Sequence, residues 1–537
     1  MSQDKNNADM ARRCKRRAQG AEATYKKPDG NTGFTPEEVL AALRENETGD
    51  AKLLVTAMRN RFVFDVKRQI FFKFAGGYWK KDLKKEALAF ACRTLREAYG
   101  KEAARQHAIS TDPEVDKEAQ EAAKRRHDAL KSRIDRINTL RRLKSVLELA
   151  ITGDDGLAIT GDEWNPDPWT IQAGELLIDL KTGEAQPGMP GDFINKAAPT
   201  AWKGLDEPAV TWRMSLLEIF NGNAELMSYV QRVLGTSLVG KPSQQEFYVF
   251  HGPEGRNGKG TILETLKEVL GSDLANVIKS DMIMESRQSS GGSADPELLE
   301  MQGRRIVWAS ETGESKKLNT EKMKLFTGGD TLSGRYNYSN EIISFKPTHT
   351  LFLLTNFKPR IGADNAAWDR LRLIPFSLRF VDTPKAPNER KKDTALDEKL
   401  LQEASGILAW LVQGCLDTLK NGLNPPKIVT EAVEEYRLDE DIVQQFIDER
   451  CYLGTGYKVQ KGHLLDDFKK WHSETFGEKA TPPSPQKVST RLQNMPGIQR
   501  EKTSRVVFLH GIALAAKDAG PDKNTTNKAG KVKDDEF

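Results

Sequence analysis

A glycine-rich turn at residues 252–258 is the stretch whose residue types and spacing best suit chemistry. It follows the apolar run FYVF and precedes Lys259 and the helical pattern TILETLKEVL. Glycines in such a turn let backbone N–H groups close around phosphates, the helix amino terminus adds positive potential, and the lysine reaches the β- and γ-phosphates. The residues expected to form this phosphate-binding loop are Gly252, Pro253, Glu254, Gly255, Arg256, Asn257, Gly258, Lys259, Gly260 and Thr261.

The loop departs from the usual phosphate-binding pattern at two positions. Gly252 lies six residues before Gly258 rather than five, and Gly260 stands where a magnesium-binding Ser or Thr usually follows the lysine. Thr261 is the nearest hydroxyl, so it is the expected magnesium ligand from this loop. The alternative interpretation is a glycine-rich turn that binds nothing.

Two further apolar runs end in polar side chains that could act on a bound nucleotide. The run IVWA is followed by Ser310 and Glu311, and the run THTLFLLT by Asn356. Ligands of open α/β sheets bind outside the carboxyl ends of the strands. We therefore expect Glu311 to orient the attacking water or to hold magnesium, and Asn356 to bond the γ-phosphate or that water. Either residue could instead simply end a strand, as Asn often does.

A tyrosine-rich stretch between these two runs is a candidate for contact with a nucleic acid. Its sequence predicts a hairpin from Arg335 to Lys346, with Tyr336 and Tyr338 near its tip. Cationic side chains bind phosphates and aromatic rings stack on unpaired bases, so this hairpin suits a single strand. An ordinary hairpin with exposed tyrosines is the alternative.

Two arginines follow the second apolar run in the sequence WDRLRLIPF. An arginine supplied by a neighbouring subunit is worth about 10³–10⁵ in the rate of phosphoryl transfer. Arg370, or in second place Arg372, could serve a neighbour's nucleotide in this way, which would imply a ring of subunits. Either arginine could instead form an ion pair at the surface.

Composition excludes several classes of protein. The chain has 537 residues, 29% of them charged, a mean hydropathy of −0.59, and no apolar run near the ~18–20 residues that a membrane span needs. The first residues, MSQDKNNADMARRCKRR, lack the apolar stretch of a secretory signal. Neither the four cysteines nor the seven histidines show metal-site spacing. These features predict a protein of a reducing cytoplasm, and its net charge of +4 means that any DNA-binding surface is local.

Patterns along the chain predict an α/β protein of several parts. Strands and helices alternate over 245–380, as in a parallel α/β core. A charged stretch at 113–150 predicts one long helix, and the last helices close on a hairpin, as in a winged helix. The expected parts are a disordered basic tail or phosphate-gripping arm (1–50), an N-terminal domain (51–215), a helical collar (216–244), the core (245–380), a helical segment (381–430), a winged-helix-like domain (431–516) and a disordered tail (517–537).

The motifs GPEGRNGKGT, SET, KLFTGGDTLSGR, LLTN and WDRLRLIPF occur in this order within about 120 residues. This set resembles the superfamily 3 helicases, specifically the helicase part of phage and plasmid primase–helicases related to the poxvirus primase–helicase. The resemblance covers roughly residues 55–515.

The resemblance implies a ring-forming, commonly hexameric AAA+ P-loop ATPase that uses ATP and Mg²⁺. It further implies movement along single-stranded DNA at replication forks of a phage, plasmid or other mobile genetic element, in the cytoplasm of a bacterial host. A separate primase or polymerase is a possible partner. By motif, Lys259 and Thr261 would bind phosphate and magnesium, Glu311 would be the Walker B acid, Asn356 sensor 1 and Arg370 the arginine finger. The hairpin tip lacks the lysine–histidine pair of some viral relatives, which leaves its individual DNA contacts open.

Three rival functions remain open from the sequence. The first is an origin-recognising initiator whose ATPase controls assembly, and the winged-helix pattern favours it. The second is a AAA+ protein remodeller that grips polypeptide with the tyrosine hairpin. The third is a primase–polymerase, which would need a nucleotidyl-transfer site within 51–215; the first 200 residues show no acidic-plus-histidine set for it.

Overall fold

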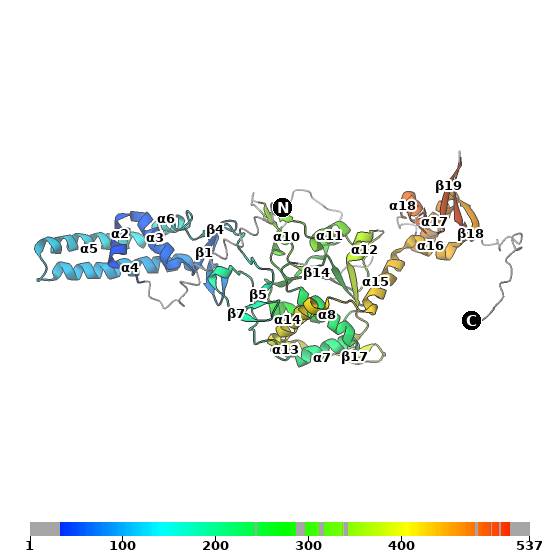
Figure 1. The fold of residues 1–537 in the computed structure, drawn as a ribbon, viewed down its shortest axis with the longest axis horizontal. Helices are drawn as coiled ribbons and strands as arrows, with labels where there is room; N and C mark the ends of the chain where they lie inside the picture. Colours follow the sequence, from blue (N-terminus) through cyan, green and yellow to red (C-terminus); the bar gives the residue numbers. More distant parts are fainter. Residues whose placement is uncertain are drawn as a thin grey trace, which may run out of the picture. The chain divides into compact units, whose positions relative to one another are not determined.

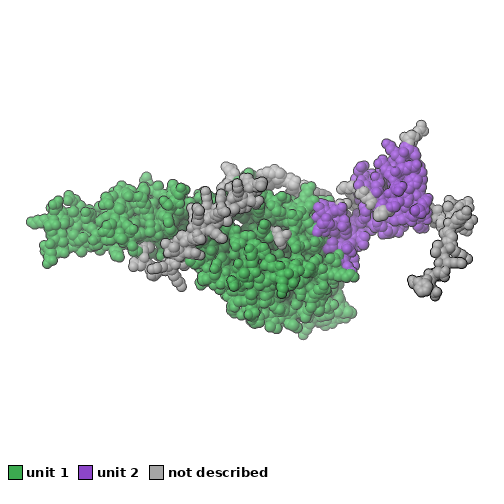
Figure 2. All heavy atoms as spheres, in the orientation of Figure 1, with its two compact units in different colours: residues 1–359, 370–430 green, residues 360–369, 431–537 purple. Residues whose placement is uncertain are grey.

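The computed structural model describes residues 33–241, 244–285, 296–310, 316–335, 337, 342–362, 364–477, 482–493, 495, 497–503 and 506–515 (Figure 1). The chain divides into two compact units (Figure 2). Unit 1 comprises residues 1–359 and 370–430, and unit 2 comprises 360–369 and 431–537. Among the described residues, no helix is long and apolar enough to cross a membrane.

Unit 1 begins with a cluster of helices. They are α2 (Pro36–Arg44), α3 (Asn46–Met58), α4 (Glu86–Thr111), α5 (Lys117–Ile137) and α6 (Leu140–Ala150). The prediction of a tail up to residue 50 is therefore wrong for 33–50. Thr35 and Glu38 form a reciprocal capping box that starts α2, and Val39 and Ala42 pack into the helical core. The predicted tails at 1–32 and 517–537 lie outside the described residues.

A buried carboxylate joins four of these helices, α3, α4, α5 and α6. Asp50 of α3 is fully buried and accepts from Arg133 Nη1 at 2.7 Å, Arg142 Nη2 at 2.6 Å and the Tyr99 hydroxyl at 2.5 Å. The single long helix predicted at 113–150 is wrong, because the chain is extended at Thr139 and starts a new helix. This break lets arginines from α5 and α6 approach the same carboxylate from two directions.

Two small sheets accompany the helical cluster, and three strands of the first lie between α3 and α4 in the sequence. The first contains β1 (Phe62–Asp65), β2 (Ile70–Ala75), β3 (Tyr78–Lys81) and β4 (Ala158–Ile159) in the order β3-β2-β1-β4. The second contains β5 (Thr170–Ala173), β6 (Leu176–Asp179), β7 (Ala185–Pro187) and β8 (Ala197–Ala198) in the order β7-β6-β5-β8. The strands expected around 62–79 and the hairpins expected around 165–202 are confirmed.

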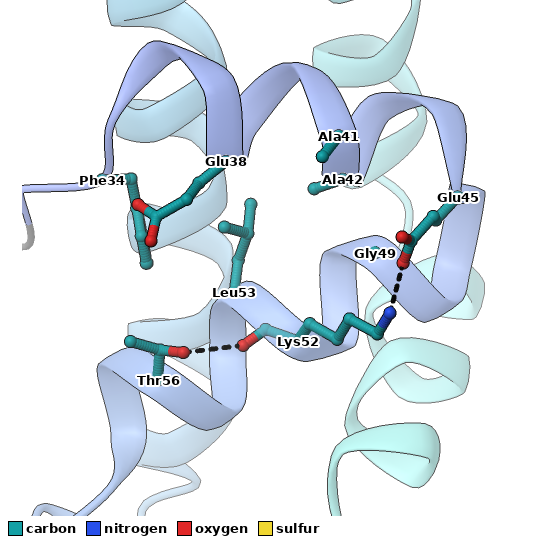
Figure 3. Close-up of a pocket in the computed structure, with 9 residues that line it drawn as sticks. All are labelled: Phe34, Glu38, Ala41, Ala42, Glu45, Gly49, Lys52, Leu53 and Thr56. Carbon is teal, nitrogen blue, oxygen red and sulfur yellow. Dashed lines mark hydrogen bonds and ion pairs between the residues drawn. The ribbon is translucent and has the colours of Figure 1, made fainter.

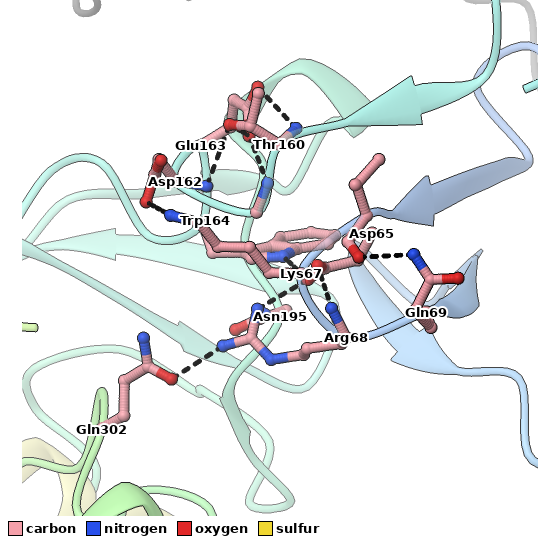
Figure 4. A network of polar contacts seen from close by, with 12 residues as sticks. Asp65, Lys67, Arg68, Gln69, Thr160, Asp162, Glu163, Trp164, Asn195 and Gln302 are labelled. Atoms are coloured by element: carbon pink, nitrogen blue, oxygen red, sulfur yellow. Dashed lines mark hydrogen bonds and ion pairs between the residues drawn. The ribbon is translucent and has the colours of Figure 1, made fainter. Parts of the chain in front are cut away.

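Buried Asp65 is the centre of a polar network beside these sheets (Figure 4). It accepts from the backbone N–H of Arg68 at 2.9 Å, from Arg68 Nη1 at 2.6 Å and from Trp164 Nε1 at 2.7 Å. Arg68 Nη2 also donates to Gln302 Oε1 at 2.9 Å. The network therefore connects the first sheet to Gln302, more than 200 residues further along the chain.

The central sheet of unit 1 is parallel throughout. Its strands are β9 (Phe247–His251), β10 (Ala275–Ile278), β11 (Ile306–Ser310), β14 (Thr350–Thr355) and β15 (Leu371–Pro375), in the order β10-β11-β14-β9-β15. Helices α9 (Lys259–Leu270), α10 (Pro296–Glu300), α11 (Thr320–Thr327) and α12 (Asn365–Arg370) lie between the strands in sequence. The predicted parallel α/β core is confirmed. Its strands are near-continuous apolar runs, which are typical of strands buried on both faces.

Four further helices of unit 1 share the core of this sheet. They are α7 (Val210–Ile219), α8 (Ala224–Thr236), α13 (Leu396–Gln402) and α14 (Ala404–Asn421). α8 approaches α14 closely at Gly235, where a Cβ atom would lie 2.4 Å from the carbonyl oxygen of Leu411. The helices expected within 216–244 and 381–430 are confirmed, but the short parallel strands β16 (Arg379–Val381) and β17 (Glu389–Lys391) were not predicted.

The predicted domain boundary at residue 215 is wrong. Ile171 and Ile178 of the second small sheet belong to the same hydrophobic core as Trp212 and the strands of the parallel sheet. The Thr200 hydroxyl also donates to the carbonyl oxygen of Val269 in α9 at 2.7 Å. The second small sheet is therefore packed as part of the domain that contains the parallel sheet.

Unit 2 has its own core of three helices and a sheet. After α15 (Lys427–Glu440), which crosses between the units in sequence, it contains α16 (Ile442–Arg450), β18 (Cys451–Gln460), α17 (Lys461–Phe476), α18 (Pro485–Gln493), β19 (Gln499–Lys502) and β20 (Val507–Leu514). The sheet has the order β18-β20-β19 and is antiparallel. The predicted helices and final hairpin are confirmed, whereas β18 was not predicted.

Candidate nucleotide-binding site

The glycine-rich loop leaves the parallel sheet at the point where the strand order reverses. β9 lies between β14 and β15, and the chain runs from β9 to the far edge of the sheet before it returns. His251, the last residue of β9, is paired with Thr355 on one side and with Pro375 on the other. Ligands of open α/β sheets bind at such a switch point, outside the carboxyl ends of the strands.

Close backbone contacts shape the loop between β9 and α9. A Cβ atom at Gly252 would lie 2.1 Å from Asn257 Nδ2 and 2.6 Å from the carbonyl oxygen of Phe376, so only glycine fits there. Buried Asn257 donates from Nδ2 to the carbonyl oxygen of Glu254 at 2.7 Å. Gly258 has φ of +86° immediately before α9, which glycine adopts without strain. The loop thus forms a glycine cradle at the amino terminus of a helix.

Lys259 and Asn356 meet beside this cradle, as expected for a site at the sheet edge. Lys259 is the first residue of α9 and is only 7% exposed. Its Nζ donates to Asn356 Oδ1 at 2.8 Å and to the carbonyl oxygen of Gly252 at 3.3 Å. Burial lowers the pKa of Lys259 to about 8, because the charged amine loses its water shell. A buried amine in a glycine cradle at a helix amino terminus fits the phosphates of a nucleotide.

The two residues expected to bind magnesium are only partly described. Thr261 is half-buried in the first turn of α9, and a Cβ atom at Gly260 would meet nothing within 4 Å. Glu311 lies outside the described residues, although β11 ends at Ser310, beside Leu354 of β14. Over the described ranges, no group of three or more His, Cys, Asp and Glu suits a metal ion. The magnesium site therefore stays a prediction.

The two candidate arginine fingers have different surroundings within their own chain. Arg370 ends α12, and its Nη1 donates to the carbonyl oxygen of Lys324 at 2.9 Å and to Thr327 Oγ1 at 3.1 Å. Arg372 lies within β15 and forms an ion pair with Glu246 at 2.9 Å. Arg372 is paired with Tyr248, three residues before the end of β9, so it lies about 10 Å back from the carboxyl edge of the sheet.

The two strands at the base of the hairpin expected before β14 are present. β12 (Leu332–Gly334) and β13 (Ile343–Phe345) are antiparallel, with Ser333 opposite Ser344. Arg335 directly follows β12 and is partly exposed, and Lys346 directly follows β13 and is exposed. Tyr336 and Tyr338 lie outside the described residues. The DNA-contacting role of all four residues stays a prediction.

The segment after β15 also binds the loop, which the sequence did not indicate. The backbone N–H of Phe380 donates to the carbonyl oxygen of Arg256 at 2.7 Å, and Arg256 has φ of +62°. Next to it, Arg379 Nη1 lies 3.4 Å from Glu254 Oε2 in the loop and 3.7 Å from Glu389 Oε1 in β17. No spacing rule relates residue 379 to the loop, and only the pairing of β15 with β9 brings the two together.

A separate pocket of about 200 Å³ lies between α2 and α3 (Figure 3). Its polar side chains bind one another or the backbone. Lys52 Nζ lies 2.7 Å from Glu45 Oε2, and the Thr56 hydroxyl donates to the carbonyl oxygen of Lys52 at 3.1 Å. Glu38 accepts from the backbone N–H of Thr35 at 2.8 Å. We assign no ligand to this pocket.

Residues 51–221 match the family model described as "D5 N terminal like". A protein of Acanthamoeba polyphaga mimivirus named "Putative helicase L207/L206" is 34% identical over 320 residues, which cover 56% of this chain and 33% of that protein. An African swine fever virus protein named "Putative primase C962R" is 23% identical over 242 residues, covering 42% of this chain and 24% of that protein. This chain therefore spans a third or less of the length of these two relatives.

A solved structure described as "The apo structure of NrS-1 C terminal region (305-718)" also matches. It is 10% identical, covers 86% of this chain and 98% of its own, and has a TM-score of 0.43. Both curated relatives above are proteins of viruses, so the expectation of a bacterial host stays a prediction. By the matched residues and the names of these relatives, this chain is similar to primase–helicases related to the poxvirus primase–helicase.

Proposed function

We propose that this chain is an ATP-dependent helicase of DNA replication in a virus, phage, plasmid or related genetic element. The observation that carries the proposal is the meeting of Lys259 and Asn356 at the switch point of the parallel sheet. A P-loop lysine and a sensor amide at this place are suited to the γ-phosphate of ATP. Names of the viral relatives support a role in replication.

The residues of the site divide the work of hydrolysis between them. Lys259 Nζ exchanges its contacts with Asn356 and Gly252 for the β- and γ-phosphates, and Asn356 then bonds the γ-phosphate or the attacking water. Glu311 orients that water. Magnesium, held through Thr261 and Glu311, would neutralise charge on the phosphates. Because phosphoryl transfer needs positioning and positive charge more than covalent chemistry, these groups suffice together with an arginine from a neighbouring subunit.

We further propose that the motor is a ring oligomer, with six subunits as the first expectation. Arg370 would reach the nucleotide of the next subunit, and hydrolysis would move the β12–β13 hairpins, which draw one DNA strand through the ring. A separate primase or polymerase would then work with it at the fork. The AAA+ assignment of the core and the winged-helix assignment of unit 2 belong to the same proposal.

A second candidate function is an ATP-controlled initiator that binds duplex DNA at an origin. The observation that favours it is the compact set of three helices and a three-stranded antiparallel sheet in unit 2. A helix of such a domain could enter a major groove. An initiator would bind duplex DNA and would fail to unwind a fork.

The decisive experiment measures ATP hydrolysis with and without single-stranded DNA, together with unwinding of a forked substrate and particle mass with a non-hydrolysable ATP analogue. We expect hydrolysis stimulated by the single strand, unwinding, and a mass of several subunits. Lys259→Ala should abolish hydrolysis. Substantial DNA-stimulated hydrolysis by that variant, or a particle that stays monomeric and inactive with both ligands, contradicts the proposal. Stimulation by unfolded protein instead would indicate a remodeller.

A further inference from the structure

A short helix links unit 2 to one of the candidate arginine fingers. Residues 360–369 belong to unit 2, although the chain before and after them belongs to unit 1, so the division falls within α12, between Asp369 and Arg370 (Figure 2). Leu371, the next residue, is fully buried in β15 and is paired with Phe247 of β9. In sequence, Arg370 therefore lies between a helix that packs within unit 2 and a strand that is fixed in the parallel sheet.

An aromatic pair holds α12 against α15. The ring centres of Trp368 and Tyr436 are 5.0 Å apart with 83° between the planes, an edge-to-face arrangement that aromatic pairs prefer. Both side chains are buried, at 4% and 1% exposure. Trp368 Nε1 also donates to the carbonyl oxygen of Gly362 at 2.9 Å, which ties the helix to the segment before it. A ring of α15 thus fixes a side chain only two residues before Arg370.

Two polar contacts add to this docking. Arg437 Nη2 donates to Oδ1 of Asn365, the first residue of α12, at 2.6 Å. The backbone N–H of buried Ile361 donates to Glu440 Oε2 at 3.1 Å. Because these contacts and the aromatic pair all come from one stretch of α15, we expect α12 to move together with that helix.

The side chain of Arg370 is held by a different element, α11 of unit 1. Its Nη1 donates to the carbonyl oxygen of Lys324 at 2.9 Å and to Thr327 Oγ1 at 3.1 Å. A displacement of α12 would change these distances directly, since Arg370 is the last residue of that helix. Lys259 and the glycine-rich loop lie on β9 and α9, so the same displacement leaves them in place.

We propose that Trp368 and Tyr436 are positioning residues through which unit 2 sets the rate of ATP hydrolysis by way of Arg370. This inference rests on the proposed function, in which Arg370 acts on the nucleotide of a neighbouring subunit. Misplacing a catalytic group by about 1 Å can lower a rate by about 10²-fold. Loss of the docking should therefore slow turnover and leave ATP binding as it was.

The main test compares kcat, the KM for ATP and the Kd for a non-hydrolysable analogue in the full chain with single-stranded DNA. Tyr436→Ala should lower kcat by about 10- to 100-fold and leave KM and Kd nearly unchanged. Tyr436→Phe keeps the ring and should turn over like the parent. Leu438→Ala is the matched control on the same helix, because its side chain is 62% exposed.

A second pair of variants avoids the buried rings. Asn365 is exposed, so Asn365→Ala should fold like the parent, and it should lower kcat by about 2- to 10-fold because one hydrogen bond of the docking is lost. Asn365→Asp keeps an oxygen acceptor for Arg437 and should retain the kcat of the parent.

A double variant separates positioning from a general loss of structure. If Tyr436 acts through Arg370, adding Tyr436→Ala to Arg370→Ala should not lower the residual kcat any further. Losses that multiply would overturn the proposal. So would a parent-like kcat in both Tyr436→Ala and Asn365→Ala when Arg370→Ala has stopped turnover. A parent-like kcat in Arg370→Ala would instead remove the finger from the proposed function, and this proposal with it.

Hydrogen exchange tests the docking without any hydrolysis. The backbone N–H groups of Ala367 and Trp368 donate to the carbonyl oxygen of Asp364 at 3.0 and 3.2 Å. These amides should exchange faster in Tyr436→Ala than in the parent, and at the parent rate in Leu438→Ala. Equal exchange in all three proteins would show that Tyr436 does not hold α12, and it would overturn the proposal whether or not the motor works.

Discussion

The backbone N–H of Phe380 donates to the carbonyl oxygen of Arg256 at 2.7 Å, so the segment after β15 supports the glycine-rich loop directly. The side chain before it adds a second contact, from Arg379 to Glu254 at 3.4 Å. Since Arg256 has a left-handed backbone conformation, which costs energy for a residue other than glycine, this support helps to hold the loop in shape.

Arg379→Ala should raise the KM for ATP by about two- to fivefold with kcat nearly unchanged. The ion pair with Glu254 is partly exposed, and such pairs contribute at most about 1 kcal/mol. Steady-state ATPase kinetics check this. The charge exchange Arg379→Glu with Glu254→Arg should bring the KM for ATP back close to the value of the parent protein. A fall in kcat without a change in KM would show that Arg379 acts in turnover.

Lys259 should make the stability of the nucleotide-free protein rise with pH. Its pKa is about 8 in the folded protein, against 10.5 for an ordinary lysine. Between these values the unfolded chain binds a proton that the folded chain does not, so the free energy of unfolding increases with pH in this window. From pH 7.5 to 9.5 we expect a gain of about 2 kcal/mol relative to Lys259→Met, measured by urea unfolding. Equal pH profiles for the two proteins would show that the amine is not buried.

The same amine should make ATP binding weaker at high pH. Phosphates attract the protonated form, and this form is lost as the pH rises through about 8 in the free protein. The Kd for a non-hydrolysable ATP analogue should therefore increase steadily above pH 8, as measured by calorimetry. A Kd that does not change up to pH 10 would place the amine away from the phosphates.

An added methyl group should destabilise the protein at one glycine of the loop and have no effect at another. At Gly252 a Cβ atom would overlap Asn257 and the carbonyl oxygen of Phe376, whereas at Gly255 it would meet nothing within 4 Å. Gly252→Ala should cost about 1–3 kcal/mol of stability, as overpacking does, and should impair ATP binding. Gly255→Ala is the control and should unfold like the parent protein in nucleotide-free urea melts. Comparable losses in the two variants would contradict this loop geometry.

Changing Arg370 to alanine should impair catalysis, whereas changing Arg372 to alanine should impair stability. Arg370→Ala should leave ATP binding largely intact and lower kcat by about 10³-fold or more, and mixing it with a Glu311→Gln subunit should partly restore activity. Arg372→Ala should instead cost about 1–3 kcal/mol of stability, because it leaves the carboxylate of Glu246, at 11% exposure, without its cationic partner, although the Tyr248 hydroxyl still donates to it. If no mixing ratio restores activity, Arg370 does not act on a neighbour.

Local patterns were enough to predict the loop, its lysine and the strands of the parallel sheet. Each of these depends on a short run of residues: FYVF is a buried strand, and the glycines before Lys259 permit the close contacts and the positive φ that the loop needs. The meeting of Lys259 with Asn356 also follows from sequence, since both residues come at the carboxyl ends of parallel strands.

Features that depend on distant partners were missed or wrong. The segment at 33–50 is charged and reads as a tail, yet it folds because Asp50 finds Arg133 and Arg142 more than 80 residues away. The contact of Arg379 with the loop requires β15 to pair with β9, which no motif spacing encodes. β18 was missed because Gly454, Thr455 and Gly456 interrupt its sequence, so it lacks the alternation of a half-buried strand.

The core shared by Ile171, Ile178 and Trp212 with the parallel sheet has a consequence for how this protein can be divided. A fragment that starts at residue 216 would leave apolar side chains of the sheet domain in water, and we expect it to aggregate. The match to residues 51–221 covers much of this shared core. Gene fusions and recombination that preserve the sheet domain must therefore carry the upstream β-sheet along with it.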